Sequence, residues 1–227
     1  MILFYITSAV LLISVFWRIL CCKYNLPWPA FLAFWLENPY MKIFANPNAL
    51  VKHLEIAEDA HALEIGSGAG RILHRLALSK NGNGTHIGIE LQKKMIFLAR
   101  KNLSRLPKNI ARSIIHANID ITKINPGHSQ LSKNKFDLIL LVTVLGEIPD
   151  KVKVLKIAKR LLKEHGVIVI QEVIPDPCYV SSVTIHKYAK AAGLRHIKTQ
   201  KNRLNYISTF GLRENLDHYN LTSTSRL

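Results

Sequence analysis

The chain has 227 residues, of which 48% are hydrophobic, and a formal net charge of +16 from 31 Lys and Arg against 15 Asp and Glu. This length accommodates one α/β domain with a short appendage, and the apolar content excludes a disordered chain. The three cysteines are too few for a disulfide framework, and neither a CxxC nor an HExxH spacing occurs, so we expect no metal site. The positive charge favours a polyanionic partner, either nucleic acid or anionic lipid.

Residues 1–22 form an apolar segment in which 18 side chains are apolar. Its uncharged part, residues 1–17, approaches the roughly 20 residues that span a bilayer, and Arg18 can extend toward the interface. A cleaved signal peptide is disfavoured because no Lys or Arg precedes the run and the residues before Cys21 are large. A buried core helix is the other alternative. We expect residues 1–22 to be a retained transmembrane or membrane-associated helix.

Basic residues follow this apolar segment and none precedes it, which predicts a single-pass membrane protein with its C-terminal side in the cytoplasm. Residues 23–46 then form a connector rich in Trp, Tyr, Phe and Pro. Such a composition is typical of a membrane interface, and a helix packed on the following domain is the alternative. The main domain is expected over residues 47–213, followed by a polar tail over residues 214–227.

Strands alternate with helices in the main domain. Hydrophobic spacing predicts strands over residues 62–65, 86–90, 113–117, 136–142 and 167–170, and helices over residues 71–79, 92–105, 150–164 and 184–192. Gly166 and Gly193 are expected to cap the last two helices, and residues 195–200 and 205–212 to form a closing antiparallel hairpin. The alternation predicts an α/β fold, with a Rossmann-like, doubly wound, mostly parallel sheet of seven strands.

A glycine-rich turn, Gly66-Ser67-Gly68-Ala69-Gly70, joins the first expected strand to the next helix. Glycines at such a turn let the backbone approach a ligand closely. Glu90 ends the second strand, 24 residues after Gly66, a spacing that suits a carboxylate accepting both ribose hydroxyls of a nucleotide. The turn alone is a weak signal, but the strand and the acid together predict an adenosine-type cofactor.

Four segments resemble motifs of the class I S-adenosylmethionine-dependent methyltransferases, in their broad small-molecule branch. Residues 64–70 are similar to motif I, and Glu90 is similar to the acid that follows it in the family. Residues 136–150 resemble the motif IV region, and residues 161–170 resemble the turn into the fifth strand. The resemblance covers about residues 47–212, with the motifs in the family's order.

The resemblance implies S-adenosylmethionine as the cofactor. Glu64 would order the loop or hold the amino group, and Glu90 would hold the ribose hydroxyls. Asn118 stands where the family often has an Asp that reads the adenine amine, and an amide oxygen can accept the same hydrogen bond. The full cofactor-binding set implied by the resemblance is Glu64, Gly66, Ser67, Gly68, Gly70, Glu90, Leu91, Asn118, Ile119 and Thr143.

Thr143 and Glu147 are the candidate catalytic residues. Thr143 follows the fourth strand, where donor and acceptor meet in the family. The family often has His where this chain has Gly146-Glu147, and Glu147 can serve as a general base or orient a substrate hydroxyl, unless it caps a helix or pairs with a Lys. Glu172 and Asp176 are expected to line the same pocket after the fifth strand. A divalent ion held by these acids is disfavoured.

Basic side chains repeat at helical spacing in two groups, of which the first is Lys153, Lys156, Arg160 and Lys163, and the second is Lys93, Lys101, Arg105, Lys108 and Arg112. A solvated helix surface, docking to anionic lipid and nucleic-acid binding are the three interpretations. The Asp/Asn-Pro-Pro-Tyr/Phe segment typical of base methylation is absent, and no RNP-like aromatic run occurs. These absences disfavour nucleic acid.

Together these features predict a membrane-anchored methyltransferase that transfers a methyl group from S-adenosylmethionine to a hydrophobic small molecule or lipid. A methyltransferase of a membrane protein's Lys or terminus, an RNA methyltransferase and a non-catalytic S-adenosylmethionine-binding protein are the alternatives. The sulfonium methyl is already activated, so the enzyme mainly aligns it and excludes water. The lack of a recognisable catalytic dyad therefore does not count against an enzyme.

Overall fold

The computed structural model describes residues 46–54, 56–125, 131, 135–174 and 176–212, together with residues 5, 16, 18–20, 23 and 24. The expected anchor over residues 1–22 and the connector over residues 23–46 lie largely outside these described residues, and the tail over residues 214–227 lies wholly outside them. Within the described part of the chain, no helix is long and apolar enough to cross a membrane. The expected anchor therefore stays a prediction.

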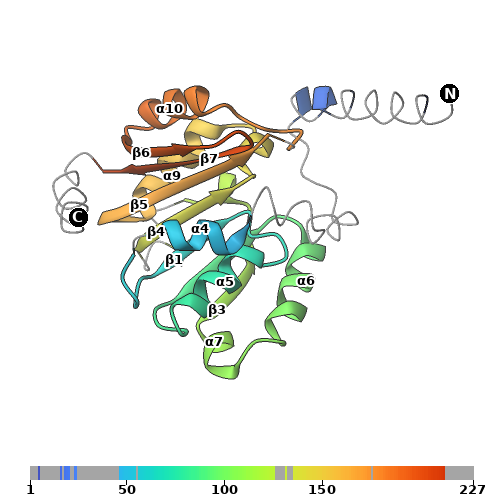
Figure 1. The fold of residues 1–227 in the computed structure, drawn as a ribbon, viewed down its shortest axis with the longest axis vertical. Helices are drawn as coiled ribbons and strands as arrows, with labels where there is room; N and C mark the ends of the chain where they lie inside the picture. Colours follow the sequence, from blue (N-terminus) through green and yellow to red (C-terminus); the bar gives the residue numbers. More distant parts are fainter. Residues whose placement is uncertain are drawn as a thin grey trace.

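Seven strands form one sheet in the spatial order β3-β2-β1-β4-β5-β7-β6 (Figure 1). They are β1 Ala62–Ile65, β2 His86–Glu90, β3 Ile114–Asn118, β4 Phe136–Val142, β5 Leu162–Val173, β6 Arg195–Lys201 and β7 Asn205–Gly211. β1 to β5 pair in parallel, and β7 runs antiparallel to both β5 and β6. The mostly parallel sheet with its closing hairpin is confirmed. The strand order reverses between β1 and β4, and ligands bind beyond the carboxyl ends of strands at such a reversal.

The helices connect these strands. They are α4 Pro47–His53, α5 Arg71–Ser79, α6 Lys93–Leu103, α7 Lys108–Arg112, α9 Lys151–Leu161 and α10 Ser182–Ala191, with the 3-10 turns η2 Ile121–Lys123 and η3 Leu145–Glu147. The short helices α4 and α7 were not expected. α4 begins where Asn46 accepts the Asn48 N–H at 2.9 Å and Pro47 opens the first turn, a favourable helix start.

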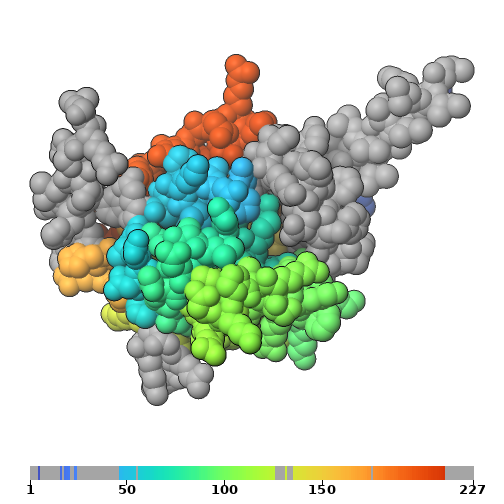
Figure 2. All heavy atoms as spheres, turned by 60° about the horizontal axis from the view of Figure 1, so that its bottom comes forward, coloured from blue at the N-terminus to red at the C-terminus, as the bar shows by residue number. Residues whose placement is uncertain are grey.

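Two helix layers cover the two faces of the sheet. Along β4, Leu138 and Leu140 pack with α4 and α5, whereas Ile139 and Leu141 pack with α9 and α10. Figure 2 shows α4, α5 and α6 side by side on one face. A strand buried on both faces reads as an uninterrupted apolar run, which explains the sequence of β4.

The structure corrects one helix end. α9 stops at Leu161 and β5 begins at the next residue, so Gly166 lies inside a strand and caps no helix. Its lack of a side chain allows close packing, because a Cβ there would lie 2.7 Å from the carbonyl oxygen of Phe136. Pairing with β4 outweighs the helical propensity of residues 162–164. The cap at Gly193 is confirmed, since this residue follows α10 with a φ of 75°.

Candidate functional site

The glycine-rich turn is held at the carboxyl end of β1 by hydrogen bonds to β2. The N–H groups of Gly66 and Ser67 both donate to the carbonyl of Ile89, at 2.9 and 3.1 Å. The Gly70 N–H donates to the Ser67 carbonyl at 2.9 Å and closes the turn before α5. Gly66, Gly68 and Gly70 all have positive φ, a conformation that favours glycine. The backbone therefore explains the spacing of the three glycines.

Glu90, the last residue of β2, points its carboxylate at this turn. Its Oε2 accepts the Gly68 N–H at 3.0 Å, and its Oε1 accepts the Gln92 N–H at 2.8 Å. Each carboxylate oxygen can accept a second hydrogen bond. The two backbone bonds thus orient the group and leave acceptor capacity for two further donors, such as vicinal hydroxyls.

The described part of the chain leaves Gly68 uncovered, and an apolar residue directly follows β2. Among the residues that the structure describes, no atom lies within 4 Å of the position that a Cβ of Gly68 would take. Leu91, which directly follows Glu90, is 57% exposed. Unobstructed backbone next to a fixed carboxylate admits a polar ligand, and an exposed leucine offers an apolar surface to a flat ring. These residues fit an adenosine-type cofactor.

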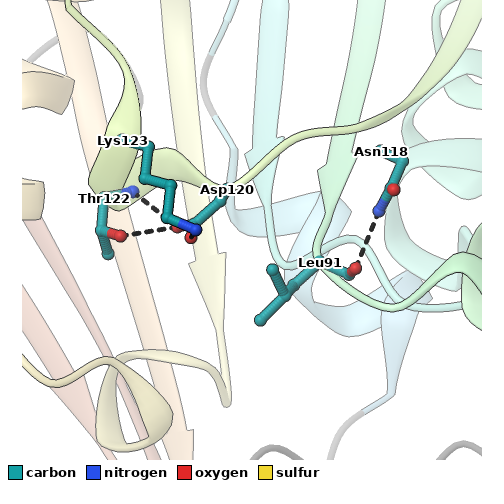
Figure 3. A network of polar contacts seen from close by, with 5 residues as sticks. All are labelled: Leu91, Asn118, Asp120, Thr122 and Lys123. Carbon is teal, nitrogen blue, oxygen red and sulfur yellow. Dashed lines mark hydrogen bonds and ion pairs between the residues drawn. The ribbon is translucent and has the colours of Figure 1, made fainter.

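Asn118 ends β3 and fastens it to the chain that leaves β2. Its amide nitrogen donates to the carbonyl oxygens of Glu90 and Leu91, at 2.8 and 2.7 Å, and Figure 3 shows the second of these bonds. Both amide hydrogens are used in this way, so Oδ1 is the atom that can accept a bond from an adenine amine. The Ile119 N–H also donates to the Glu90 carbonyl, at 3.1 Å.

Glu64 lies under the turn, 2% exposed, and its Oε2 accepts the Leu73 N–H at 3.1 Å. The N-cap of α5 is Gly70, which has no side chain to offer, so Glu64 satisfies one of the free N–H groups in the first helical turn. Burial raises the pKa of Glu64 to about 8, although the Leu73 N–H and the charge of Arg71 act to lower it. This contact favours the loop-ordering role that we considered for Glu64.

Thr143 follows β4 directly, with a φ of 50°. A positive φ is uncommon for a β-branched residue and persists only where the surroundings hold it. The Thr143 N–H donates to the carbonyl of Gln171 in β5 at 2.8 Å. The chain therefore turns sharply at the carboxyl ends of β4 and β5, beside the reversal in strand order.

Glu147 ends the 3-10 turn η3 and is partly exposed. It does not cap the following helix, because Asp150 does so by accepting the Lys153 N–H at 2.8 Å. Its charge helps to raise the pKa of Glu172, so the two carboxyl groups lie near one another. The described residues include no group of three or more His, Cys, Asp or Glu arranged to hold a metal ion.

Glu172 lies inside β5 rather than after it, and it is 1% exposed. The Val180 N–H donates to its carboxylate, and the Tyr206 hydroxyl donates to the Val180 carbonyl. Burial, followed by the charges of Asp176 and Glu147, raises the pKa of Glu172 well above its usual value. Burial also raises the pKa of Asp176, to about 6. Glu172 therefore positions the loop over residues 176–180.

Gly146 brings this loop against η3. A Cβ on Gly146 would collide with the carbonyl oxygen of Cys178. The φ of Gly146 is not positive, so its role is close approach rather than backbone conformation. The glycine at this position thus lets residues 176–180 pack against the segment that carries Glu147.

We expect Gly146→Ala to destabilise the fold by about 1–3 kcal/mol, because backbone must move to admit the methyl group. Urea unfolding followed by circular dichroism measures this change. Gly211→Ala is the matched control, since its Cβ would meet first the flexible end of Ile197, at 3.0 Å. Equal destabilisation by the two variants would contradict the close approach.

A buried polar cluster beneath the turn was not anticipated. Nε2 of His74 in α5 lies 2.7 Å from Nε2 of His116 in β3. A Cβ on Gly70 would lie 2.5 Å from the same His74 nitrogen. Oγ of Ser67 and Nδ1 of His116 are buried and have no hydrogen-bond partner among the described residues. The two histidines stand 42 residues apart in the chain, so no spacing in the sequence could have paired them.

Comparison with known proteins agrees with this geometry. Residues 56–211 match the family described as "Methyltransferase domain". An arsenite methyltransferase from Aquipseudomonas alcaligenes is 26% identical over 125 residues, which are 53% of this chain and 35% of that protein. The chain thus spans about a third of the length of this curated relative.

Solved structures share the fold. A SAM-dependent methyltransferase from Aquifex aeolicus superposes with a TM-score of 0.71 at 19% identity, covering 81% of this chain and 98% of that one. A magnesium protoporphyrin IX methyltransferase from Synechocystis, solved with bound SAM, gives a TM-score of 0.62 at 13% identity, covering 86% and 89%. At these identities the similarity concerns the fold.

Proposed function

The chain belongs to the methyltransferase-domain family, and we propose that it is a membrane-associated methyltransferase that uses S-adenosylmethionine to methylate a hydrophobic small molecule or lipid. The observation that carries the cofactor assignment is the fixed Glu90 carboxylate beside the open backbone of Gly68. Neighbours of the same fold include one solved with SAM and one solved with S-adenosylhomocysteine. Their ligands support the same cofactor class here.

The residues of the site have separate tasks in this proposal. Glu90 would accept hydrogen bonds from the ribose hydroxyls, and Leu91 would offer an apolar surface to the adenine ring. Asn118 would accept a hydrogen bond from the adenine amine through Oδ1. When bound, S-adenosylmethionine supplies an activated methyl group on a sulfonium.

The acceptor end is formed by Thr143, Glu147 and the loop over residues 176–180. The strained turn at Thr143 fixes the edge of β4, where an acceptor atom would be aligned. Glu147 is partly exposed, whereas Glu172 is buried. Where the methyl acceptor must lose a proton, Glu147 serves as the base that takes it. Where no proton is lost, Glu147 orients the hydroxyl or amine of the substrate.

A membrane-resident acceptor is supported by the N-terminal segment. Eighteen of residues 1–22 are apolar, and Arg18 is the single charged residue among them. Nη1 of Arg18 lies 3.4 Å from the carbonyl oxygen of Asp176, in the loop that packs against η3. Arg18, the charged residue of this segment, therefore contacts the loop at the acceptor end of the domain, which favours an acceptor drawn from the bilayer.

Two incubations test the proposal. The full chain is mixed with radiolabelled methyl donor and total cell extract in one, and with the same donor and a membrane fraction in the other. We expect counts in the organic phase and at least tenfold fewer for a chain lacking residues 1–22, because the donor site remains but the acceptor is not reached. Cofactor binding, measured by calorimetry on both chains, is the control and should be unchanged. Counts confined to protein or to RNA would overturn the lipid acceptor and support those alternatives instead.

A further inference from the structure

A hollow of about 590 Å³ lies between η2 and α9, and none of its lining residues belongs to the glycine-rich turn. Four of its lining side chains are cations, one from η2 and three from α9, and two are isoleucines. These six are Lys123, Lys153, Lys156, Arg160, Ile124 and Ile157. Among the described residues, no Asp or Glu lines it. The hollow thus combines a basic rim with apolar side chains.

The fold rather than the sequence assembles this set. Lys153, Lys156 and Arg160 repeat at helical spacing along α9, but Lys123 comes from the segment after β3. Lys163, which the sequence placed in the same group, lies in β5 and pairs with Oδ2 of Asp137 at 2.8 Å. Lys163 is therefore absent from the residues that line the hollow, and Lys123, which sequence spacing could not identify, is among them.

The cations on α9 are not neutralised within the described part of the chain. The side chains of Lys153, Lys156 and Arg160 form no ion pair or hydrogen bond there. Lys123 lies 3.4 Å from Oδ2 of Asp120. That carboxylate also accepts the Thr122 N–H and hydroxyl through Oδ1, as Figure 3 shows. Three cations thus face solvent around a hollow that could hold an anion.

We propose that this hollow binds the phosphate-bearing headgroup of an anionic lipid and so docks the domain on the membrane surface. Arg160 can bind a phosphate through two N–H groups, and the lysines add point charges. Ile124 and Ile157 suit the glycerol carbons below the phosphate. The choice of lipid depends on the membrane association in the proposed function, because the same chain carries the apolar segment over residues 1–22.

Binding of the full chain to vesicles tests this proposal. One set of vesicles is phosphatidylcholine alone, and the other also contains phosphatidylglycerol. We expect tighter binding to the anionic vesicles, with slower hydrogen exchange over residues 151–160 than on neutral vesicles. The variant K153Q/K156Q/R160Q should lose roughly 100-fold of the anionic preference, since each basic residue near such a surface contributes about fivefold.

The matched control, K93Q/K101Q/K108Q, removes the same charge from exposed positions on α6 and α7. An equal loss of anionic preference in both triple variants would overturn the proposal that the hollow binds lipid, because net charge alone would then explain the preference. Binding of single-stranded RNA is measured with the same proteins. If K153Q/K156Q/R160Q loses RNA binding but keeps its preference for anionic vesicles, the lipid proposal is overturned in favour of nucleic acid. Binding to neutral vesicles and cofactor binding report on the proposed function separately, so a failure of either is distinguishable from a failure of the hollow.

Discussion

Replacing Glu90 with alanine should weaken S-adenosylmethionine binding by roughly 100-fold or more. The change removes the acceptor of two ribose hydroxyls, and hydrogen bonds to a charged group contribute about 1.5–3 kcal/mol each. It also removes the bonds from Oε2 to Gly68 and from Oε1 to Gln92, so the turn loses one of its attachments to β2. Isothermal titration with S-adenosylmethionine and with S-adenosylhomocysteine measures the loss.

Two further variants separate the ligand contact from the loop attachment. Glu90→Gln keeps one acceptor oxygen and should lose about tenfold. Glu58→Ala removes the same charge from an exposed turn before β1 and should leave the affinity unchanged. Native affinity in Glu90→Ala, with the fold intact by circular dichroism, would refute the assignment of the turn as the cofactor site.

The buried pair of His74 and His116 should make the fold lose stability as the pH falls from about 6.5 toward 4. Burial lowers the pKa of each to about 4, whereas an unfolded histidine keeps a value near 6.5. The unfolded state therefore binds more protons in this window, so stability is present above pH 6.5 and is lost below it. Linkage gives a loss of about 2 kcal/mol per histidine by pH 5.

Buried carboxyl groups act in the opposite direction over an overlapping range. The folded-state pKa of Glu64 is about 8, so the folded state binds more protons than the unfolded state between about 4.5 and 8. This contribution to stability grows as the pH falls. The pH dependence of the native chain's stability contains both effects. The contribution of the histidines is therefore obtained by comparing the native chain with a variant that lacks both histidines.

Urea unfolding from pH 7.5 to 5 of the native chain and of His74→Leu/His116→Leu provides that difference. The double variant should lose several kcal/mol less on acidification, because replacing both partners leaves no buried imidazole to protonate. His74→Gln/His116→Gln is the second form to use if the leucine variant does not fold. The exposed His53→Gln should follow the native profile. Parallel profiles for native and double variant would exclude the pair as the acid-sensitive element.

Local patterns were sufficient to predict the glycine turn after β1 and the acid that ends β2 beside it. The strand, the glycine turn and the acid at the end of the next strand are neighbours in the sheet because β1 and β2 pair in parallel. Their relation in the chain therefore translates directly into proximity. The acceptor side was predicted less well. Glu172 turned out to hold Val180 from within β5, and the extent of a strand depends on its partner's length rather than on its own residues.

The hairpin of β6 and β7 was also only partly predictable from the sequence. Its two segments were evident from the sequence, but their order was not: β7 pairs with β5, and β6 lies at the edge. β7 buries Tyr206 and Phe210 completely, whereas β6 is rich in Lys and Arg with its ends exposed. A charged strand at the edge protects the sheet from further pairing.

Alternating hydrophobicity, turn residues and short motif spacings are properties of neighbouring residues, so the sequence alone was enough to identify the fold class, the glycine turn and the acid that faces it. Contacts between distant segments depend on how strands and helices pack, and the folded chain was needed to reveal them. The approach of Gly146 to Cys178, the pairing of His74 with His116 and the addition of Lys123 to the cations of α9 are all of this kind. Each joins residues whose separation in the chain carries no periodic signal, and each arises from the packing of elements in the complete sheet and its helices.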